Sequence, residues 1–435
     1  MNILLIGSGG REHALARKCA ESPDTRIYAA PGNPGIFQFA HAAHLGEKAL
    51  NANHHAEVCE FCEMAAIDVV IIGPEAPLAS GLADDLRARN IAVFGPSRLA
   101  AQLESSKKFA KDFMQKHGIP TAQYRSFSVQ EHAAAREYVA NHALPVVIKA
   151  DGLAAGKGVS VATTHREALT ALDGMFDGKF GAAGHNIVVE EFMHGEEASL
   201  FAISDGERFL TLASAQDHKR IGEGDTGENT GGMGAYAPAP LVTPDILRRT
   251  EERVIAPVLA AMKQEGMPFV GCLYAGLMID AEGNPRVVEF NARFGDPETQ
   301  VICSVFDGDL TKLLHSAALG NLDPSAVRNV ARGVACCVVL AAGGYPGEVR
   351  KGDEIMGIAD AEATGAVVFH AGTALHHESG KDKLTTNGGR VLGVTARGEN
   401  LQEAITASYE AVSKIHFRGK TYRTDIGQKG LNTSK

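Results

Sequence analysis

Apolar runs and helical patterns alternate along the first hundred residues. The apolar runs cover residues 2–6, 27–30, 69–72 and 91–94, and the helical patterns cover residues 12–21, 55–66 and 81–90. Strands that alternate with helices in this order form a parallel sheet with helices on both faces. The pattern therefore predicts an α/β, doubly wound parallel-sheet domain over residues 1–103.

Each predicted strand of this domain ends in a glycine or proline turn. The turns are Gly7-Ser8-Gly9-Gly10, residues 31–35, residues 73–75 and Gly95-Pro96. In open parallel sheets, ligands bind beyond the carboxyl ends of the strands. Glycine makes up 48 of the 435 residues without a collagen-like repeat, so we expect the excess in turns and ligand-binding loops.

The pattern changes after Pro96. A long charged helix is predicted around residues 105–117, followed by a smaller α/β segment to residue 193 and by strands to about residue 319. Residues 216–240 have almost no apolar period and are predicted as a long loop, a feature that in compact domains is usually functional. The last hundred residues are rich in strands and turns. We expect a central domain over residues 104–327 and a strand-rich C-terminal domain over residues 328–430.

Charge and composition exclude several classes of protein. The 42 basic and 52 acidic residues give a net charge of −10, which disfavours a general binder of nucleic acids or membrane surfaces. The longest apolar stretches are too short to span a bilayer. Residues 1–10 lack a basic segment, so we interpret them as a strand and not a signal peptide, and we expect a cytoplasmic protein. Seven irregularly spaced cysteines fit reduced thiols better than a disulfide framework.

The first glycine turn is similar to a dinucleotide-binding fingerprint but departs from it. The third glycine of that fingerprint would fall on Glu12, which is too large for close packing of helix and strand. The second strand also lacks the acidic residue that holds a ribose. The turn with Arg11 at a helix N-terminus favours an anion, and a phosphate-bearing substrate fits better than NAD. The alternative is a tight turn without a ligand.

A glycine-rich segment with two lysines lies between two predicted strands. Lys149 ends the first strand, and the connecting segment contains Gly152, Gly156, Lys157 and Gly158. It is not a Walker A loop, because glycine follows Lys157 and a strand follows the loop. We interpret it as a hairpin flap whose amides and lysine cover nucleotide phosphates and exclude water. An ordinary glycine-rich hairpin is the alternative.

One predicted strand carries residues suited to a metal ion and a phosphoryl group. Strand alternation puts Glu289, Asn291 and Arg293 on one face. A carboxylate and an amide oxygen suit Mg²⁺, which takes few protein ligands beside phosphate oxygens. Arg293 is placed to stabilise charge on a transferring phosphoryl group. The alternative is a polar edge of a sheet.

Two further segments are weaker candidates. The strand over residues 187–193 leads into a turn that could present main-chain groups at Glu191 and Met193 to an adenine edge. The loop from Asp217 to Gly232 mixes fixed charges with consecutive backbone amides, which favour a small charged acceptor. A solvated acidic face and a surface loop are the respective alternatives.

Together these motifs resemble the ATP-grasp superfamily, and longer strings are similar to the phosphoribosylamine–glycine ligase family across essentially the whole chain. The strings, in chain order, are GSGGREHAL, APGNPG, GPEAPL, SSKKFAKDFM, IKADGLAAGKGV, QDHKR, NTGGMGAY, LYAGLMI, EFNARFGDPETQ and AAGGYPG. The resemblance implies a central ATP-grasp domain with a mobile lid over about residues 122–193. It also implies ATP-dependent ligation of glycine to 5-phosphoribosylamine through glycyl phosphate, an early step of purine synthesis.

The resemblance also implies roles for individual residues. The expected catalytic residues are Arg293, Lys149 and Lys157. The expected ATP-binding residues are Lys107, Lys149, Gly152, Gly156, Lys157, Gly158, Glu190, Glu191, Met193 and Glu197. Glu289 and Asn291 would hold Mg²⁺ or Mn²⁺, and Gly276 stands where many relatives have a second acidic ligand. The residues expected at glycine and phosphoribosylamine, not divided between the two, are Gly9, Gly10, Arg11, Gly32, Asn33, Glu75, Asp217, Lys219, Arg220, Asn229, Thr230, Gly231, Gly232, Arg293 and Asp296.

Other functions remain open from the sequence. One alternative is another ATP-grasp carboxylate–amine ligase with a different acceptor, and a second is a non-catalytic nucleotide-binding protein. A nicotinamide oxidoreductase is disfavoured by Glu12. We expect small-molecule substrates, no nucleic-acid or membrane partner, and a monomer.

Overall fold

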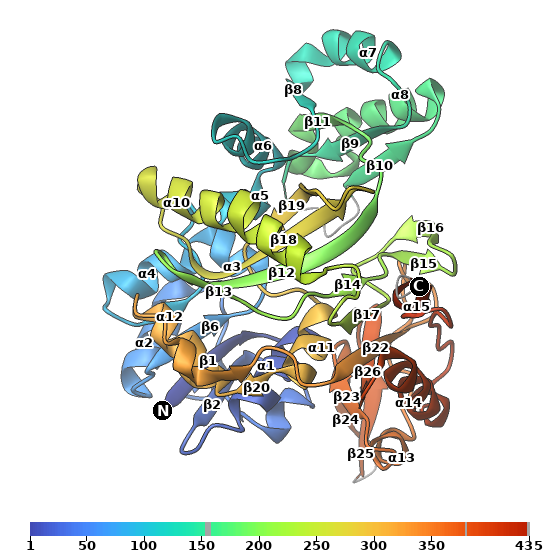
Figure 1. Ribbon diagram of the computed structural model, residues 1–435. Helices are drawn as coiled ribbons and strands as arrows, with labels where there is room; N and C mark the ends of the chain where they lie inside the picture. Colours follow the sequence, from blue (N-terminus) through green and yellow to red (C-terminus); the bar gives the residue numbers. More distant parts are fainter. Residues whose placement is uncertain (153–157, 379–380, 433–435) are drawn as a thin grey trace.

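The computed structural model describes residues 1–152, 158–378 and 381–432, and its N-terminal domain is the predicted parallel sheet (Figure 1). The strand order is β3-β2-β1-β6-β7, and all neighbouring strands are parallel. The strands are β1 (Asn2–Gly7), β2 (Arg26–Pro31), β3 (His41–Ala42), β6 (Val69–Ile72) and β7 (Val93–Phe94), and the helices are α1 (Gly10–Cys19), α2 (His55–Met64), α3 (Glu75–Ser80) and α4 (Leu82–Ala88). Alternate residues of β1 and β6 belong to two different core clusters, because helices cover both faces of the sheet.

A second, antiparallel sheet projects from the body of the molecule, at the top of Figure 1. Its order is β10-β9-β11-β8. The strands are β8 (Tyr124–Ser128), β9 (Val146–Ala150), β10 (Val159–Ala162) and β11 (Asn186–Glu191). Helices α7 (His132–Ala140) and α8 (His165–Gly174) cover one face and share its separate small core. The opposite face carries Lys149 and Glu190 towards the rest of the central domain.

The central domain continues in an antiparallel sheet of order β13-β12-β18-β19. The strands are β12 (Glu196–Asp205), β13 (Phe209–Thr211), β18 (Val270–Ile279) and β19 (Pro285–Asn291). Leu200, Leu273 and Ala275 pack on one face in the cluster that includes Val258 and Leu259 of α10 (Ala256–Gln264). The other face carries the polar residues of the candidate site. Among the described residues, no helix has both the length and the apolar character needed to cross a bilayer.

The C-terminal sheet has the order β14-β17-β22-β26-β23 and draws strands from two parts of the chain. Strands β22 (Val334–Ala341), β23 (Val367–His370) and β26 (Arg390–Gly398) come from the C-terminal segment, whereas β14 (Gln216–Asp217) and β17 (Gly234–Ala237) come from the central one. Helix α14 (Leu401–Lys414) packs on this sheet and shares a core cluster with β22 and β26. The sheet therefore crosses the boundary that the sequence predicts at residues 327–328.

The prediction of a long loop over residues 216–240 is wrong. The segment contains four short strands, β14, β15 (Arg220–Gly222), β16 (Thr226–Asn229) and β17. Strand β17 pairs with β22, and β15 pairs with β16 as a hairpin. Strands of two to four residues are too short to show an apolar period. Their pairing partners hold them in place, and for β17 this partner, β22, is distant in sequence.

Buried polar contacts join the N-terminal and C-terminal domains. The side-chain amide of Asn33 donates to the carbonyls of Ser8 (2.8 Å) and His370 (2.9 Å), and its oxygen accepts from the backbone amides of Gly35 and Ile36. His13 Nδ1 accepts from the His370 amide at 2.8 Å. Both histidines are buried at this contact.

These histidines predict a loss of stability in acid. Burial lowers the pKa of His13 to about 3 and that of His370 to about 4. Histidine in an unfolded chain has a pKa of about 6.5. Below that pH the two histidines therefore bind protons in the unfolded protein but stay neutral in the folded protein. The free energy of unfolding therefore falls as the pH drops from about 6.5 towards 4, by up to about 1.4 kcal/mol per pH unit for each histidine. Urea unfolding across this range measures the slope.

A matched pair of variants isolates the contribution of His13. His13→Asn keeps an acceptor for the His370 amide but removes the titrating ring. We therefore expect the slope of the unfolding free energy against pH to fall by up to about 1.4 kcal/mol per pH unit, which corresponds to one proton. His416→Asn, at an exposed position in the C-terminal domain, is the control and should leave the slope unchanged. Equal slopes in all three proteins would contradict the assignment.

Candidate active site

Strand register gathers polar residues on one face of the central sheet. In β18 and β19, Gly276 lies opposite Glu289 and Tyr274 lies opposite Asn291. Ser199 of β12 lies opposite Gly276 from the other side. Because side chains alternate along a strand, Glu289, Asn291, Tyr274 and Ser199 share this face.

The sheet β10-β9-β11-β8 lies in the segment predicted as the lid and is called the lid sheet below. Its strand β9 and the predicted metal-binding strand β19 face the same space. Lys149 of β9 donates through Nζ to the carbonyl oxygen of Val288 in β19 at 3.0 Å. Lys107, the first residue of α6 (Lys107–Lys116), places Nζ 3.1 Å from Glu289 Oε2. Lys107 is the main cause that holds the pKa of Glu289 well below its usual range. The carboxylate of Glu289 is therefore ionised between two lysine-bearing elements.

Glu190 joins two buried lysines. Lys149 Nζ lies 3.0 Å from its Oε1, and Lys111 Nζ lies 2.9 Å from its Oε2. Burial lowers the pKa of Lys111 to about 8, although the carboxylate of Glu190 opposes the shift. The carboxylate of Glu190 is thus paired with lysines. In the predicted contact with adenine, only the backbone groups of Glu190 are left to bind the base. Sequence reasoning missed Lys111, although it lies one helical turn after Lys107 and so on the same side of α6.

Two carboxylates hold Arg293 at the end of β19. Its Nη2 lies 2.7 Å from Glu104 Oε1 and 3.2 Å from Asn291 Oδ1, and its Nε lies 3.5 Å from Glu75 Oε2. Glu104, in α5 (Gln102–Ser105), also accepts from the backbone amide of Ala292 at 2.8 Å. Burial raises the pKa of Glu104 although Arg293 opposes the shift. Glu104 was not predicted, and it binds both the arginine and the strand end that carries Asn291.

Glu289 and Asn291 fit a divalent cation. They present an ionised carboxylate and an amide oxygen on one strand face, a donor set that suits Mg²⁺ completed by phosphate oxygens and water. Gly276 lies directly opposite Glu289, so the position of the missing second acidic ligand carries no side chain. No cluster of three or more histidine, cysteine or carboxylate side chains at ligand spacing occurs in the part of the chain that the structure describes.

A second group of charges lies beside this face. Lys219 Nζ is 2.6 Å from Glu197 Oε2. Tyr274 donates its hydroxyl to Glu298 Oε1 at 2.7 Å. Burial raises the pKa of Asp217 to about 7; Lys219 opposes this shift, whereas Glu298 and Glu197 add to it. The group is therefore rich in carboxylates, and Tyr274 and Glu298 join it without having been predicted.

The N-terminal turn closes against the end of the central domain. Arg11 donates through Nε to Glu12 at 2.6 Å and through Nη1 to the Phe294 carbonyl at 3.0 Å. Glu12 also accepts from the Gly9 amide at 2.6 Å. A Cβ built on Gly9 would lie 3.2 Å from Asp296 Oδ2, and one on Gly10 would lie 2.5 Å from the amide nitrogen of Gln300. The predicted residues Gly9, Gly10, Arg11 and Asp296 thus meet at one place.

The other predicted loop reaches the same place through Arg390. Arg390 Nη1 donates to the carbonyls of Gly231 and Asp296, and its Nη2 lies 3.5 Å from Asp296 Oδ2. A Cβ on Gly232 would lie 2.6 Å from Pro297. Thr230 binds the carbonyl of Lys219 through its amide and hydroxyl. Arg390 had no predicted role.

The remaining predicted residues are spread more widely. Arg220 and Asn229 pair across the β15–β16 hairpin, where the Arg220 guanidinium donates to the Gly227 carbonyl. Asn33 is committed to its four structural hydrogen bonds, and Gly32, at a φ of +70°, lies under the ring of Phe37.

The lid residues complete the set of predicted positions. Glu191 accepts from the Gln123 amide at 3.0 Å and pairs with Arg286, and Met193 is buried. Gly152 has a φ of +130°, and the Gly158 carbonyl accepts from the Ala150 amide at 2.8 Å. Gly156 and Lys157 lie outside the described residues.

Comparison with known proteins covers all three domains. Models of phosphoribosylglycinamide synthetase match the chain as an N domain over residues 1–104, an ATP-grasp (A) domain over residues 105–299 and a C domain over residues 335–429. The phosphoribosylamine–glycine ligase of Agrobacterium fabrum is 52% identical over 100% of this chain and 100% of its own, and that of Mesorhizobium japonicum is 51% identical over 99% of each.

A solved structure agrees with these matches. The crystal structure of phosphoribosylamine–glycine ligase from Thermotoga maritima superposes with a TM-score of 0.82 at 34% identity, covering 98% of this chain and 100% of that one. The resemblance that the motifs suggested and the predicted fold class are both confirmed. The chain belongs to the phosphoribosylglycinamide synthetase family, whose curated members are named phosphoribosylamine–glycine ligase.

Proposed function

We propose that this protein is an ATP-dependent carbon–nitrogen ligase that joins glycine to 5-phosphoribosylamine, forming glycinamide ribonucleotide, ADP and phosphate for purine synthesis. One observation carries the proposal. Lys149 of the lid sheet and Lys107 of α6 both reach β19, at the Val288 carbonyl and the Glu289 carboxylate. ATP bound between the two sheets would therefore have cations and a metal-binding carboxylate beside its phosphates.

The surrounding residues support this placement of ATP. The main chain at Glu191 and Met193 would take the adenine edge at the inner end of the lid sheet, and Glu197 the ribose. Lys107 and Lys149 would exchange their present carboxylate and carbonyl partners for phosphate oxygens, joined by Lys157 from the flap. Glu289, released from Lys107, and Asn291 would then hold Mg²⁺ or Mn²⁺, which when bound supplies positive charge between the phosphates.

Phosphoryl transfer then needs positioning and electrostatic stabilisation more than acid–base chemistry. A carboxylate oxygen of glycine attacks the γ-phosphorus, the bond to the β–γ bridging oxygen breaks, and ADP leaves. Arg293 would stabilise the charge on the transferring group, since its guanidinium is held 3.2 Å from Asn291 Oδ1 at the end of the same strand. The amine of phosphoribosylamine next attacks the carbonyl carbon of glycyl phosphate, phosphate departs with the bonding electron pair, and the amine loses a proton.

The carboxylate-rich group suits a substrate that carries an amine. Asp217 and Glu298 lie together with Glu197, and Lys219 is the cation whose ammonium pairs within the group. An ammonium group such as that of glycine would relieve the repulsion that helps to raise the pKa of Asp217. At the meeting point of Gly9, Arg11, Asp296 and Arg390, the guanidinium groups of Arg11 and Arg390 would exchange present carboxylate and carbonyl partners for the oxygens of a phosphate. A cytoplasmic location and a monomeric state stay predictions.

Replacement of Glu289 tests the metal assignment together with the reaction. Wild-type protein is expected to release ADP over many turnovers only with both glycine and phosphoribosylamine present, and not with alanine in place of glycine. Glu289→Gln removes the carboxylate charge, and we expect turnover to fall by about 10²–10³-fold. ADP release measured with a coupled assay reports both effects.

Glu282→Gln, at an exposed position on the turn between β18 and β19, is the matched control and should keep wild-type turnover. Unchanged turnover in Glu289→Gln would refute the metal assignment, whereas ADP release that ignores glycine would refute the proposed reaction.

Glu104 is expected to act as a positioning residue for Arg293. Glu104→Gln keeps hydrogen-bond acceptance from the Ala292 amide but removes the charge opposite Arg293, so we expect kcat to fall by about tenfold with little change in KM for ATP. Glu104→Asp should restore part of the loss. Steady-state kinetics and thermal unfolding of the same samples separate this effect from misfolding, and a rise in KM at constant kcat would contradict it.

A further inference from the structure

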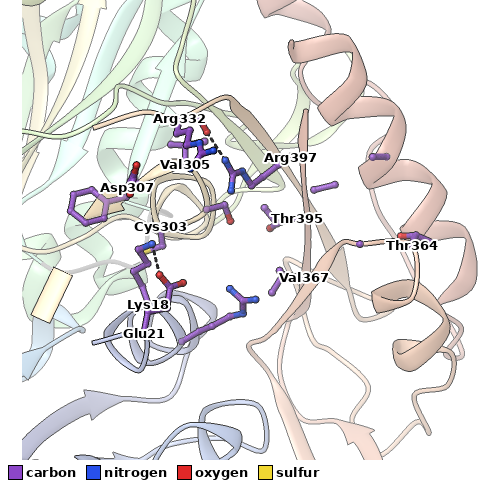
Figure 2. A pocket seen from close by; sticks show the side chains of 16 residues that line it. Lys18, Glu21, Cys303, Val305, Asp307, Arg332, Thr364, Val367, Thr395 and Arg397 are labelled. Carbon is purple, nitrogen blue, oxygen red and sulfur yellow. Dashed lines mark hydrogen bonds and ion pairs between the residues drawn. The ribbon is translucent and has the colours of Figure 1, made fainter. Parts of the chain in front are cut away.

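A polar cavity lies at the junction of the N-terminal and C-terminal domains, away from the candidate active site. Its volume is about 380 Å³. It is bounded by the end of α1, the end of α11 (Glu298–Val305), β23 and β26 (Figure 2). The end of α1 that borders it is the opposite end from Gly10, which lies at the proposed active site. A helix of ten residues is about 15 Å long, so the two sites are separate.

Four cationic side chains line this junction cavity. They are Arg17 and Lys18 of α1, Arg332 before β22, and Arg397 of β26. Figure 2 shows Arg332 and Arg397 on one side of the cavity and Lys18 with Glu21 on the other. These elements are hundreds of residues apart in sequence, yet the fold brings their charges to one space.

The carboxylates beside the cavity are already neutralised. Glu21 Oε2 lies 2.7 Å from Lys18 Nζ, and Asp307 Oδ1 accepts from Arg328 Nε at 2.9 Å. Arg397 donates to the backbone carbonyl of Arg332 at 2.7 Å. Within the described parts of the chain, the guanidinium groups of Arg17 and Arg332 have no hydrogen bond or ion pair. Arg332 also lies near enough to Asp307 to help lower the pKa of that carboxylate, after Arg328, whereas Arg17 and Arg397 face the cavity without a carboxylate ion pair in the described residues.

Helix electrostatics explains only part of this arrangement. Cations in the last turn of α1 interact favourably with the helix dipole, which accounts for Arg17 and Lys18. It does not account for Arg332 and Arg397, which come from other elements and add like charge. In a chain of net charge −10, such a concentration of positive charge favours an anionic ligand.

We propose that the junction cavity binds a small molecule that carries phosphate groups. Guanidinium groups match phosphate oxygens with paired hydrogen bonds, and they remain charged at all physiological pH values. The volume lies within the range of small-molecule sites, about 300–1,000 Å³. Bound phosphate would bridge α1 of the N-terminal domain to β26 of the C-terminal domain.

The double variant Arg17→Gln/Arg332→Gln tests this site. Both side chains are exposed and neither guanidinium makes a hydrogen bond or an ion pair in the described structure, so the variant is expected to fold, and thermal unfolding checks this. Calorimetric titration with pyrophosphate at low salt, without divalent cations, is expected to show a class of site in the wild-type protein that weakens at least tenfold in the double variant. Any pyrophosphate bound at the proposed active site contributes equally to both proteins.

Arg418→Gln is the matched control, because Arg418 is an exposed arginine of the same C-terminal domain that does not line the cavity. It should bind like the wild-type protein. Parallel titrations with inorganic phosphate and with glycerol 3-phosphate distinguish a site for free phosphate from one for a phosphate ester. If the double variant does not fold, the single variants Arg17→Gln and Arg332→Gln must each weaken binding. Identical isotherms for wild type and variants with all three probes, or no binding at all, would overturn the proposal.

Discussion

The structure depends on the mutual neutralisation of buried charges between the lid sheet and the central sheet. The ion pair of Lys107 with Glu289 is partly exposed, and beside it Lys111, Lys149 and Glu190 are buried where little water reaches them. An isolated charge in such a place costs several kcal/mol, so each cation needs a carboxylate or carbonyl within hydrogen-bonding distance. This requirement holds the lid strand β9, α6 and β19 against one another and so preforms a site in which ATP phosphates would replace protein carboxylates as the lysines' partners.

The same need for compensation explains why the N-terminal domain departs from dinucleotide-binding domains of similar topology. Its Glu12 carboxylate lies over the ends of β1 and β6: a Cβ on Gly73 would lie 2.0 Å from Oε1, and one on Gly7 would lie 2.6 Å from Cδ. These two glycines are required because the carboxylate fills the space of their side chains. Glu12 in turn accepts from Gly9 and Arg11, so negative charge already occupies part of the helix N-terminus where a pyrophosphate would otherwise bind.

The sequence predicted those features that local periodicity controls. Alternation along one strand placed Glu289 and Asn291 on a common face, and apolar runs identified the N-terminal sheet. Residues that enter the site through distant pairing were missed: Tyr274 faces Asn291 only through the β18–β19 register, and Arg390 reaches Gly231 from a strand 159 positions later. Glu104 lies in a helix of four residues, too short to show a period. Strands β14 and β17 were predicted as loop because they too are short, with two and four residues.

The sharing of strands between domains gives the C-terminal domain a direct part in the site. Asp217 belongs to β14 and pairs with Ala235 of β17, which in turn pairs with Cys337 of the buried strand β22. Arg390 extends from β26 of the same sheet to Gly231 and Asp296. The predicted substrate residues on this segment are therefore fixed by hydrogen bonds to the C-terminal sheet, while Glu289 is fixed by the central sheet and Arg293, just beyond its last strand, by Glu104 and Glu75. The relative position of the two sheets sets the distance between the proposed acceptor site and the proposed phosphoryl-transfer site, so packing between domains, and not the ATP-grasp domain alone, determines whether the reacting groups meet.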